Sequence, residues 1–181
     1  MKVAAIVGMA GSGKSEAAAR FEQDGFKRIR FGDITDEEVA RRGLALNEEN
    51  ERKVREALRC ENGMAAYAIL NKPKIDAALK TSNVVVDGLY SWEEYLFLKE
   101  SYKNNLYVIA VFSSPDTRHS RLAARKIRGL MKEESYGRDK VEIENINKGG
   151  PIAMADYTII NESTMENLIA ETDKIISRVK G

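Results

Sequence analysis

The sequence predicts an α/β fold, in which a five-stranded, mostly parallel sheet is covered by helices on both faces. Short apolar runs of strand length alternate with longer segments rich in helix-forming residues, the order expected of strand–helix–strand units. The first apolar run leads directly into a glycine-rich turn and then a helical segment, so a tight loop joins a strand to a helix. The five predicted strands are residues 3–7, 26–31, 84–86, 106–112 and 155–161.

The composition fits a single domain with a substantial core. The chain has 181 residues, of which 43% are hydrophobic and 31% charged, and its net charge is +1. A charge so close to zero creates no overall field that would attract nucleic acid or membranes. No segment approaches the ~18 consecutive apolar residues of a transmembrane helix, and the short N-terminal apolar run does not have the pattern of a signal peptide. We therefore expect one cytoplasmic domain.

The chain contains one cysteine, Cys60, and one histidine, His119. A single cysteine excludes an intrachain disulfide and a metal site built on cysteines. A lone histidine among basic residues is most simply a surface residue. We therefore predict neither a zinc site nor a Ser-His-Asp triad.

Helix signals fill the segments between the strands. Thr35 with Glu38, and Ser91 with Glu94, have the spacing of capping boxes. Ser114 is expected to cap a helix that has a proline at its first position, and Pro73 is expected to break the helical pattern around it. The predicted helices are residues 14–24, 35–43, 47–62, 64–70, 74–80, 92–102, 116–128 and 163–179.

The glycine-rich turn at residues 8–15 reads G-x-x-x-x-G-K-S, the pattern of a phosphate-binding P-loop. Its glycines allow positive φ angles, so the loop can turn its N–H groups inward, and the following helix adds the positive end of its dipole. We expect Lys14 to reach the β- and γ-phosphates of a nucleotide and the Ser15 hydroxyl to bind Mg²⁺. The alternative is a chance glycine loop, but the flanking strand and helix agree with the motif. The residues expected to bind the nucleotide here are Gly8, Ala10, Gly11, Ser12, Gly13, Lys14, Ser15 and Glu16.

Two aspartates directly follow predicted strands. Ligands bind at the carboxyl ends of parallel strands, so Asp87 is expected to lie at the substrate and to hold Mg²⁺, directly or through water. Asp33 is expected to accept the proton of an attacking hydroxyl or to position a substrate. The identity of the catalytic base stays open between the two. The alternative for each is a turn residue.

Four arginines are predicted to share one face of the helix that follows Pro115. Arg118, Arg121, Arg125 and Arg128 are separated by three, four and three residues. Their mutual repulsion costs stability unless anions offset it, and phosphoryl transfer requires positive charge around the transferred group. We expect Arg118 to bind substrate and Arg121 and Arg125 to act in catalysis; the alternative is a solvated basic helix face.

One more arginine, Arg59, lies in the predicted helix 47–62. It could hold the phosphate of a second substrate. The alternative is an ordinary surface arginine, because most single arginines on helices are exposed.

These motifs resemble those of P-loop kinases of the nucleoside and nucleotide kinase group, most nearly the adenylate-kinase-related and dephospho-CoA-kinase-like proteins of archaea and bacteria. The resemblance covers nearly the whole chain. It rests on G-M-A-G-S-G-K-S at 8–15, F-G-D at 31–33, V-V-V-D-G-L-Y-S at 84–91, R-x-x-R-L-x-x-R at 118–125, R-D-x-x-E at 138–142 and A-D-Y-T-I-I-N at 155–161.

The resemblance implies a chain of three parts. A core (1–32, 83–115 and 149–181) would bind ATP and Mg²⁺, and an inserted helical segment (about 33–82) would bind the acceptor. A lid that carries arginines (about 116–148) would close over both substrates and exclude water. It implies that Asn161 lies near the base of the donor, Asp33 near the acceptor, and Arg138 in the lid or at its hinge, where it contacts substrate. Adenylate kinases carry an arginine after D-G-F-P. This chain reads D-G-L-Y-S with Tyr90, and it lacks the P-L-L-F-E run of dephospho-CoA kinases, so neither acceptor carries over.

We therefore expect a small-molecule kinase that transfers the γ-phosphate of ATP, with GTP as the alternative donor, to a nucleotide, nucleoside or coenzyme precursor. We expect this acceptor as its partner, no membrane, and a monomer or homodimer. The alternative is an NTPase or switch acting on a protein or nucleic acid, against which the arginine-bearing lid argues. A nucleic-acid end kinase ranks third, because the net charge is near zero and exposed aromatic residues do not interleave with the arginines.

Overall fold

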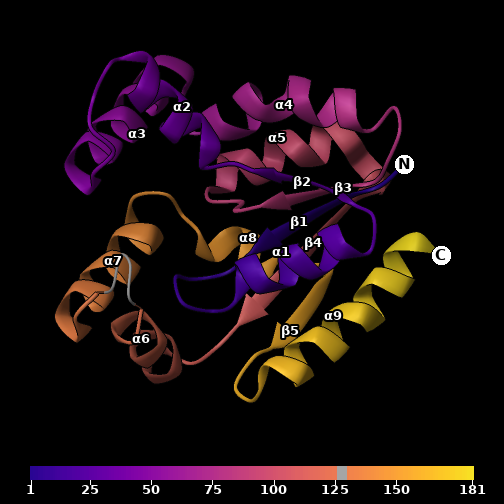
Figure 1. The fold of residues 1–181 in the computed structure, drawn as a ribbon. Coiled ribbons are helices and arrows are strands. Elements are labelled where there is room, and N and C mark those ends of the chain that lie inside the picture. The colour runs from indigo at the N-terminus through magenta and orange to yellow at the C-terminus, as the bar shows by residue number, and fades with distance from the viewer. Residues whose placement is uncertain (126–129) are drawn as a thin grey trace.

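The computed structural model describes residues 1–125 and 130–181. Within these residues, five strands form one sheet in the order β2-β3-β1-β4-β5 (Figure 1). All four pairings are parallel, so the predicted fold class is confirmed. The strands are β1 (Val3–Val7), β2 (Lys27–Arg30), β3 (Val84–Asp87), β4 (Leu106–Phe112) and β5 (Tyr157–Ile160).

Helices cover both faces of the sheet (Figure 1). Alternate residues of β1 point to opposite faces of the sheet and join two different hydrophobic cores. Ala4 and Ile6 belong to the core on the face covered by α1 (Lys14–Gln23) and α9 (Met165–Lys180). The remaining β1 residues face the other side. That side carries α2 (Asp33–Arg41), α3 (Glu48–Asn62), α4 (Ala66–Ala78), α5 (Trp92–Tyr102) and the short α8 (Gly149–Ala153).

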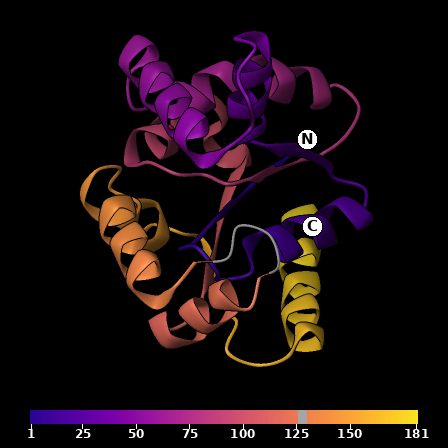
Figure 2. The same cartoon turned by 60° about the vertical axis from the view of Figure 1, so that its left-hand side comes forward.

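The carboxyl ends of the strands form one edge of the sheet. Register places Ile6 opposite both Asp87 of β3 and Ile109 of β4, so these strands end side by side. The helices α6 (Pro115–Ala123) and α7 (Lys132–Glu144) gather at this end, and both termini lie on the opposite side (Figure 1). Figure 2 shows α2–α3 and α6–α7 as two separate groups of helices. The P-loop, Asp33, Asp87 and α6 therefore all lie at the ends of strands on this edge.

The helix caps follow the sequence in two places and differ in a third. Ser91 and Glu94 form the predicted capping box, and Ser114 caps α6. The predicted cap at Thr35 is wrong, because α2 already begins at Asp33. The Thr35 hydroxyl is instead buried and lies 2.6 Å from the Tyr67 hydroxyl, so a tertiary contact replaces the cap.

Two predicted helix ends are wrong. Pro73 lies inside α4 and does not end it. The helix predicted over 116–128 ends at Ala123, and the backbone N–H groups of Arg125 and Leu130 both donate to the carbonyl oxygen of Leu122. That ending separates Arg125 from the helix that carries Arg118.

The only tryptophan of the chain packs at the start of α5. The Trp92 ring stacks on Tyr95 with centroids 5.0 Å apart, and a Cβ at Gly150 would lie 2.6 Å from it. The Trp92 backbone N–H donates to the carbonyl oxygen of Ile146 at 3.3 Å. These contacts tie α5 to the segment between α7 and α8.

The division into core, insertion and lid stays a prediction. No helix in the two described stretches has the length and apolar character needed to cross a membrane.

Candidate phosphate-binding site

The P-loop lies between β1 and α1, as its motif requires. Gly8, Gly11 and Gly13 have φ angles of +152°, +80° and +100°, which residues other than glycine rarely adopt. A Cβ at Gly8 would lie 2.3 Å from the carbonyl oxygen of Val111, and one at Gly13 would lie 2.4 Å from Asn161 Nδ2. The loop conformation and its close packing both require glycine at these positions.

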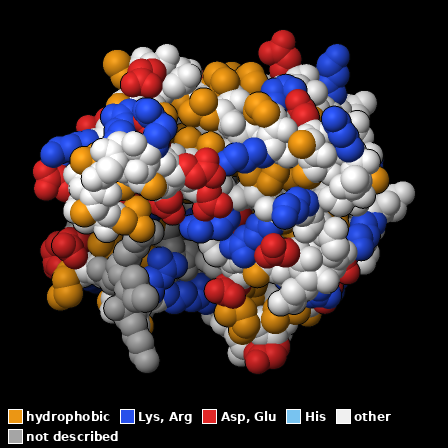
Figure 3. Space-filling model, turned by 45° about the horizontal axis from the view of Figure 1, so that its top comes forward, with side chains coloured by type: hydrophobic (Ala, Val, Ile, Leu, Met, Phe, Trp, Pro, Cys, Tyr) orange, Lys and Arg blue, Asp and Glu red, His pale blue; other side chains and the backbone are white. Residues whose placement is uncertain are grey.

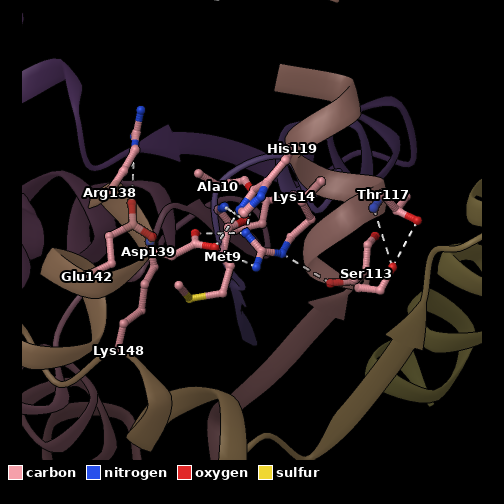
Figure 4. Close-up of polar contacts among 12 residues, drawn as sticks. Met9, Ala10, Lys14, Ser113, Thr117, His119, Arg138, Asp139, Glu142 and Lys148 are labelled. Carbon is pink, nitrogen blue, oxygen red and sulfur yellow. Dashed lines mark hydrogen bonds and ion pairs between the residues drawn. The ribbon is translucent and has the colours of Figure 1, made fainter. Parts of the chain in front are cut away.

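The carbonyl groups of the loop are held by β5 and α6. Asn161 Nδ2 donates to Ser12 O at 2.8 Å, and the Ser113 hydroxyl donates to Asn161 O at 2.6 Å. Arg118 Nη1 donates to Ala10 O at 3.2 Å (Figure 4). The buried Ser12 hydroxyl has no hydrogen-bond partner among the described residues. Asn161 therefore holds the loop itself, and the predicted contact with the donor base stays a prediction.

Lys14 is the first residue of α1 and turns back over the loop. Its Nζ donates to Met9 O at 2.9 Å. Desolvation and the ammonium of Lys148 lower the pKa of Lys14, whereas Glu142 and Asp87 act in the opposite direction, and together these effects bring it to about 7. An added phosphate would reverse this effect, because an opposite charge favours the protonated amine.

Two oxygen groups lie where Mg²⁺ is expected. Ser15 stands exposed in the first turn of α1, and the Asp87 carboxylate ends β3 with 6% of its surface exposed. Mg²⁺ is commonly held by one or two protein oxygens together with phosphates and water, so this donor set fits it. The described residues hold no group of three or more His, Cys, Asp or Glu side chains that could bind a metal without such a substrate. Arg28 of β2 also bonds to Asp87, at 2.5 Å, a partner that the sequence did not suggest.

The predicted face of four arginines on one helix is wrong. Arg118 and Arg121 lie on α6, Arg125 lies exposed beyond its end, and Arg128 is outside the described residues. Arg118 is 5% exposed and pairs with both oxygens of Asp139 at 2.8 Å, while Arg121 Nη1 donates to the Ser113 hydroxyl at 3.0 Å. Arg118 thus anchors the loop to α7. Direct contacts of Arg118, Arg121 and Arg125 with substrate stay predictions.

The single histidine is buried, so its predicted surface position is wrong. His119 Nε2 lies 2.9 Å from Asp139 Oδ2 (Figure 4), and the same carboxylate oxygen accepts from Arg118. Burial alone would raise the pKa of Asp139, but hydrogen bonds from Arg118 and His119 hold it below its usual range.

The other predicted substrate residues lie in three places. Asp33 begins α2, is half-buried and pairs with Arg30 at 3.0 Å, and it lines a groove of about 270 Å³ between β2 and α4. Arg59 of α3 lies over the Tyr67 ring, 5.3 Å from its centroid, and its buried Nε has no partner among the described residues. Arg138 of α7 donates to Glu142 at 3.2 Å. Their roles toward substrate stay predictions.

A charged cluster beside Lys14 was missed by the sequence analysis. The Lys148 ammonium, in a side chain 1% exposed, donates to Glu142 Oε2 at 2.8 Å, and Figure 4 shows Arg138 and Lys148 meeting the Glu142 carboxylate from two sides. Burial alone would raise the pKa of Glu142, but Lys148 and Arg138 hold it at about 2. The i,i+4 spacing of Arg138 and Glu142 within R-D-x-x-E could have predicted one of these pairs. Figure 3 shows Lys and Arg side chains gathered around a hollow on one face.

The comparisons with known proteins agree with this geometry. Residues 7–147 match the family described as AAA domain. The UPF0200 protein of Thermococcus kodakarensis is 39% identical over 178 residues, with 96% of each chain covered, and that of Pyrococcus furiosus is 37% identical, with 96% and 95% covered. The chain therefore belongs to the AAA domain family and, with these relatives, to the UPF0200 proteins.

Two solved kinase structures share the fold. A gluconokinase from Sinorhizobium meliloti has a TM-score of 0.61 and 16% sequence identity, and the match covers 98% of this chain and 93% of the gluconokinase chain. A shikimate kinase from Bacteroides thetaiotaomicron gives 0.62 at 14% identity, covering 97% and 98%. The likeness concerns the fold, and the predicted resemblance to P-loop kinases is confirmed.

Proposed function

We propose that the protein transfers the γ-phosphoryl group of MgATP to an oxygen atom of a small acceptor: a nucleotide, a nucleoside or a coenzyme precursor. The observation that carries this proposal is the P-loop, whose Ala10 and Ser12 carbonyl groups are fixed by Arg118 of α6 and by Asn161, directly after β5. Among the described residues, the Lys14 ammonium donates only to the Met9 carbonyl and so remains available to phosphates.

The reaction needs charge stabilisation more than covalent chemistry. The bond between the γ-phosphorus and its bridging oxygen breaks, ADP leaves, and a bond from the γ-phosphorus to the acceptor oxygen forms. Lys14 and the N-terminus of α1 hold the β- and γ-phosphates. When bound, Mg²⁺ neutralises phosphate charge, and Ser15 and Asp87 would hold it.

An acceptor hydroxyl must also lose a proton. We assign this proton to Asp33, because Asp87 is buried and would hold Mg²⁺, whereas Asp33 is accessible at the carboxyl end of β2. Transfer of the phosphoryl group to a phosphate oxygen of a nucleotide acceptor needs no such base, because this oxygen carries no proton. Asp33→Asn is therefore expected to lower kcat with a hydroxyl acceptor only.

The test is ADP release from MgATP in the presence of a panel of nucleotides, nucleosides and coenzyme precursors. Release that depends on one acceptor and is lost in Lys14→Ala, but kept in the exposed control Lys53→Ala, would support the proposal. Fast hydrolysis of ATP that no acceptor changes would contradict it and favour an NTPase.

A further inference from the structure

We propose that Lys148 is a catalytic residue that contacts the γ-phosphoryl group during transfer. This inference rests on the kinase function proposed above and adds a residue to it. Lys148 lies between α7 and α8, outside the P-loop motif and outside the arginines of α6.

The burial of Lys148 is the first observation. Its side chain is 1% exposed, and lysine is almost never fully buried unless it is paired. Its ammonium donates to Glu142 Oε2, while the other oxygen of this carboxylate accepts from Arg138. Two cations therefore share a single carboxylate.

The direction of the side chain is the second observation. Lys148 Nζ lies over the Tyr90 ring, 5.2 Å from its centroid. The Tyr90 hydroxyl packs against Gly88, where a Cβ would lie 2.9 Å away, and Gly88 follows β3 directly. The next residue, Leu89, donates its N–H to the carbonyl oxygen of Ile6 in the P-loop strand. Lys148 thus points to the carboxyl edge of the sheet beside the P-loop.

The charge balance is the third observation. Among neighbouring charges, Lys148 has the largest effect in lowering the pKa of Lys14. Burial lowers the pKa of Lys148 itself, although Glu142 opposes this. Glu142, which bonds to Lys148, is shared with Arg138, and Glu94 also favours the charged form of Lys148. A phosphoryl group would add negative charge beside Lys148 and Lys14 and so stabilise both ammonium groups.

The position of Lys148 distinguishes it from the other cations. The phosphoryl group being transferred passes from the P-loop side to the acceptor side, and Lys148 lies over the Tyr90 ring, near enough to Lys14 for its charge to act on the Lys14 amine. Charge on its three equatorial oxygens must be stabilised there. The Arg118 guanidinium cannot do this, because Asp139 and two carbonyl groups occupy it. A lysine acts on phosphate as a compact point charge.

The experiment compares the binding of ADP with that of a non-hydrolysable ATP analogue, both with Mg²⁺, by calorimetry. In Lys148→Met, we expect the analogue to bind about tenfold more weakly or worse, and ADP to change by less than about twofold, because ADP lacks the γ-phosphate. Lys148→Arg should restore most of the difference. Lys140→Met, an exposed lysine on α7, is the matched control and should bind both as the wild type does.

Equal losses for both nucleotides, or no loss for the analogue, would overturn the inference and leave the kinase proposal standing. A wild-type protein that binds neither nucleotide would overturn the kinase proposal itself. Since Lys148→Met leaves the buried Glu142 with a single partner, the double variant Lys148→Met/Glu142→Gln removes both charges. If it folds and still prefers the analogue as the wild type does, Lys148 does not contact the γ-phosphate.

Discussion

Lys14 gives the single-residue basis for a pH effect on nucleotide binding. Its pKa of about 7 in the folded protein lies below the ordinary lysine value of 10.5, so the free protein has lost this proton at pH 8 to 9. Phosphates require the charged amine, and binding must then take up a proton. We expect ATP affinity to fall as pH rises above 7, by at most about tenfold per pH unit.

Calorimetry in buffers of different ionisation enthalpy measures this proton uptake at pH 8.5. Lys14→Met is the control and should bind more weakly, without the uptake. An affinity that is constant from pH 7.5 to 9.5 would contradict the prediction.

Glu94 predicts a pH effect on stability. Its carboxylate is fully buried, and burial raises its pKa to about 7 from 4.5. The folded state therefore binds more protons between pH 4.5 and 7, so this group's contribution to stability is complete below pH 4.5 and is lost as pH rises through 7. Glu94→Gln should gain stability relative to wild type between pH 4.5 and 8, by about 3 kcal/mol at most.

Urea unfolding at pH 4.5 and pH 8 tests this prediction. The exposed Glu100→Gln is the control and should show no such difference. A stability difference between Glu94→Gln and wild type that is the same at both pH values would contradict it.

The P-loop conformation requires glycine at position 13, where no side chain larger than a hydrogen atom fits. In Gly13→Ala, the positive φ angle costs about 1–2 kcal/mol, and the new Cβ would meet Asn161 Nδ2 at 2.4 Å. We expect lower stability and loss of ATP binding, because Asn161 would no longer hold the Ser12 carbonyl.

Gly25→Ala is the matched control. Its φ is +93°, but no atom lies within 4 Å of the added Cβ. It should lower stability by a similar backbone cost and leave ATP affinity unchanged. Thermal unfolding measures the stability of both variants, and titration with ATP measures their affinity for the nucleotide. Similar ATP affinities in the two variants would mean that the Asn161 contact does not matter.

At the scale of elements, α7 is joined to the P-loop through Asp139. Removing the charge in Asp139→Asn leaves the buried Arg118 without its ionic partner, which costs about 3–5 kcal/mol for buried pairs. We expect this loss in urea unfolding, together with weaker ATP binding. Glu144→Gln, exposed on the same helix, should change neither. Normal stability of Asp139→Asn would show that the pair does not anchor α7.

Local sequence signals predicted the helices well where local chemistry decides. The capping box of Ser91 and Glu94 needs only two residues three positions apart, and it formed. Pro73 did not end α4, because the buried face of Tyr67, Asn71 and Ile75 packs on the rest of the protein. Tertiary packing outweighs local preference in such a helix.

At the scale of the whole molecule, the sequence predicted the five strands and the P-loop but not the order of the strands. β3 pairs between β1 and β2, so Asp87 lies opposite Ile6 although 81 positions separate them. The sequence nevertheless placed Asp87 correctly at the carboxyl edge of the sheet. A residue at the end of any strand lies at this edge, because all the strands run parallel.

The cluster around Lys148 could not be predicted in the same way. Its members come from α1, α7 and the segment between α7 and α8, and α7 lies in a polar stretch without a clear apolar period. Asp139 meets Arg118 across 21 positions. Pairs of this kind depend on the tertiary fold, and charged residues in sequence usually read as solvated surface.

The packing of Trp92 has a consequence for observing the protein at work. Its indole ring packs against Gly150, two residues beyond Lys148, and the backbone N–H of Trp92 donates to the carbonyl oxygen of Ile146. Since the chain has no other tryptophan, its tryptophan emission comes from this one junction between α5 and α8. A shift of that junction when a nucleotide enters would change the colour or intensity of the emitted light. The molecule thus carries a fluorescent reporter next to its proposed catalytic lysine, without any dye.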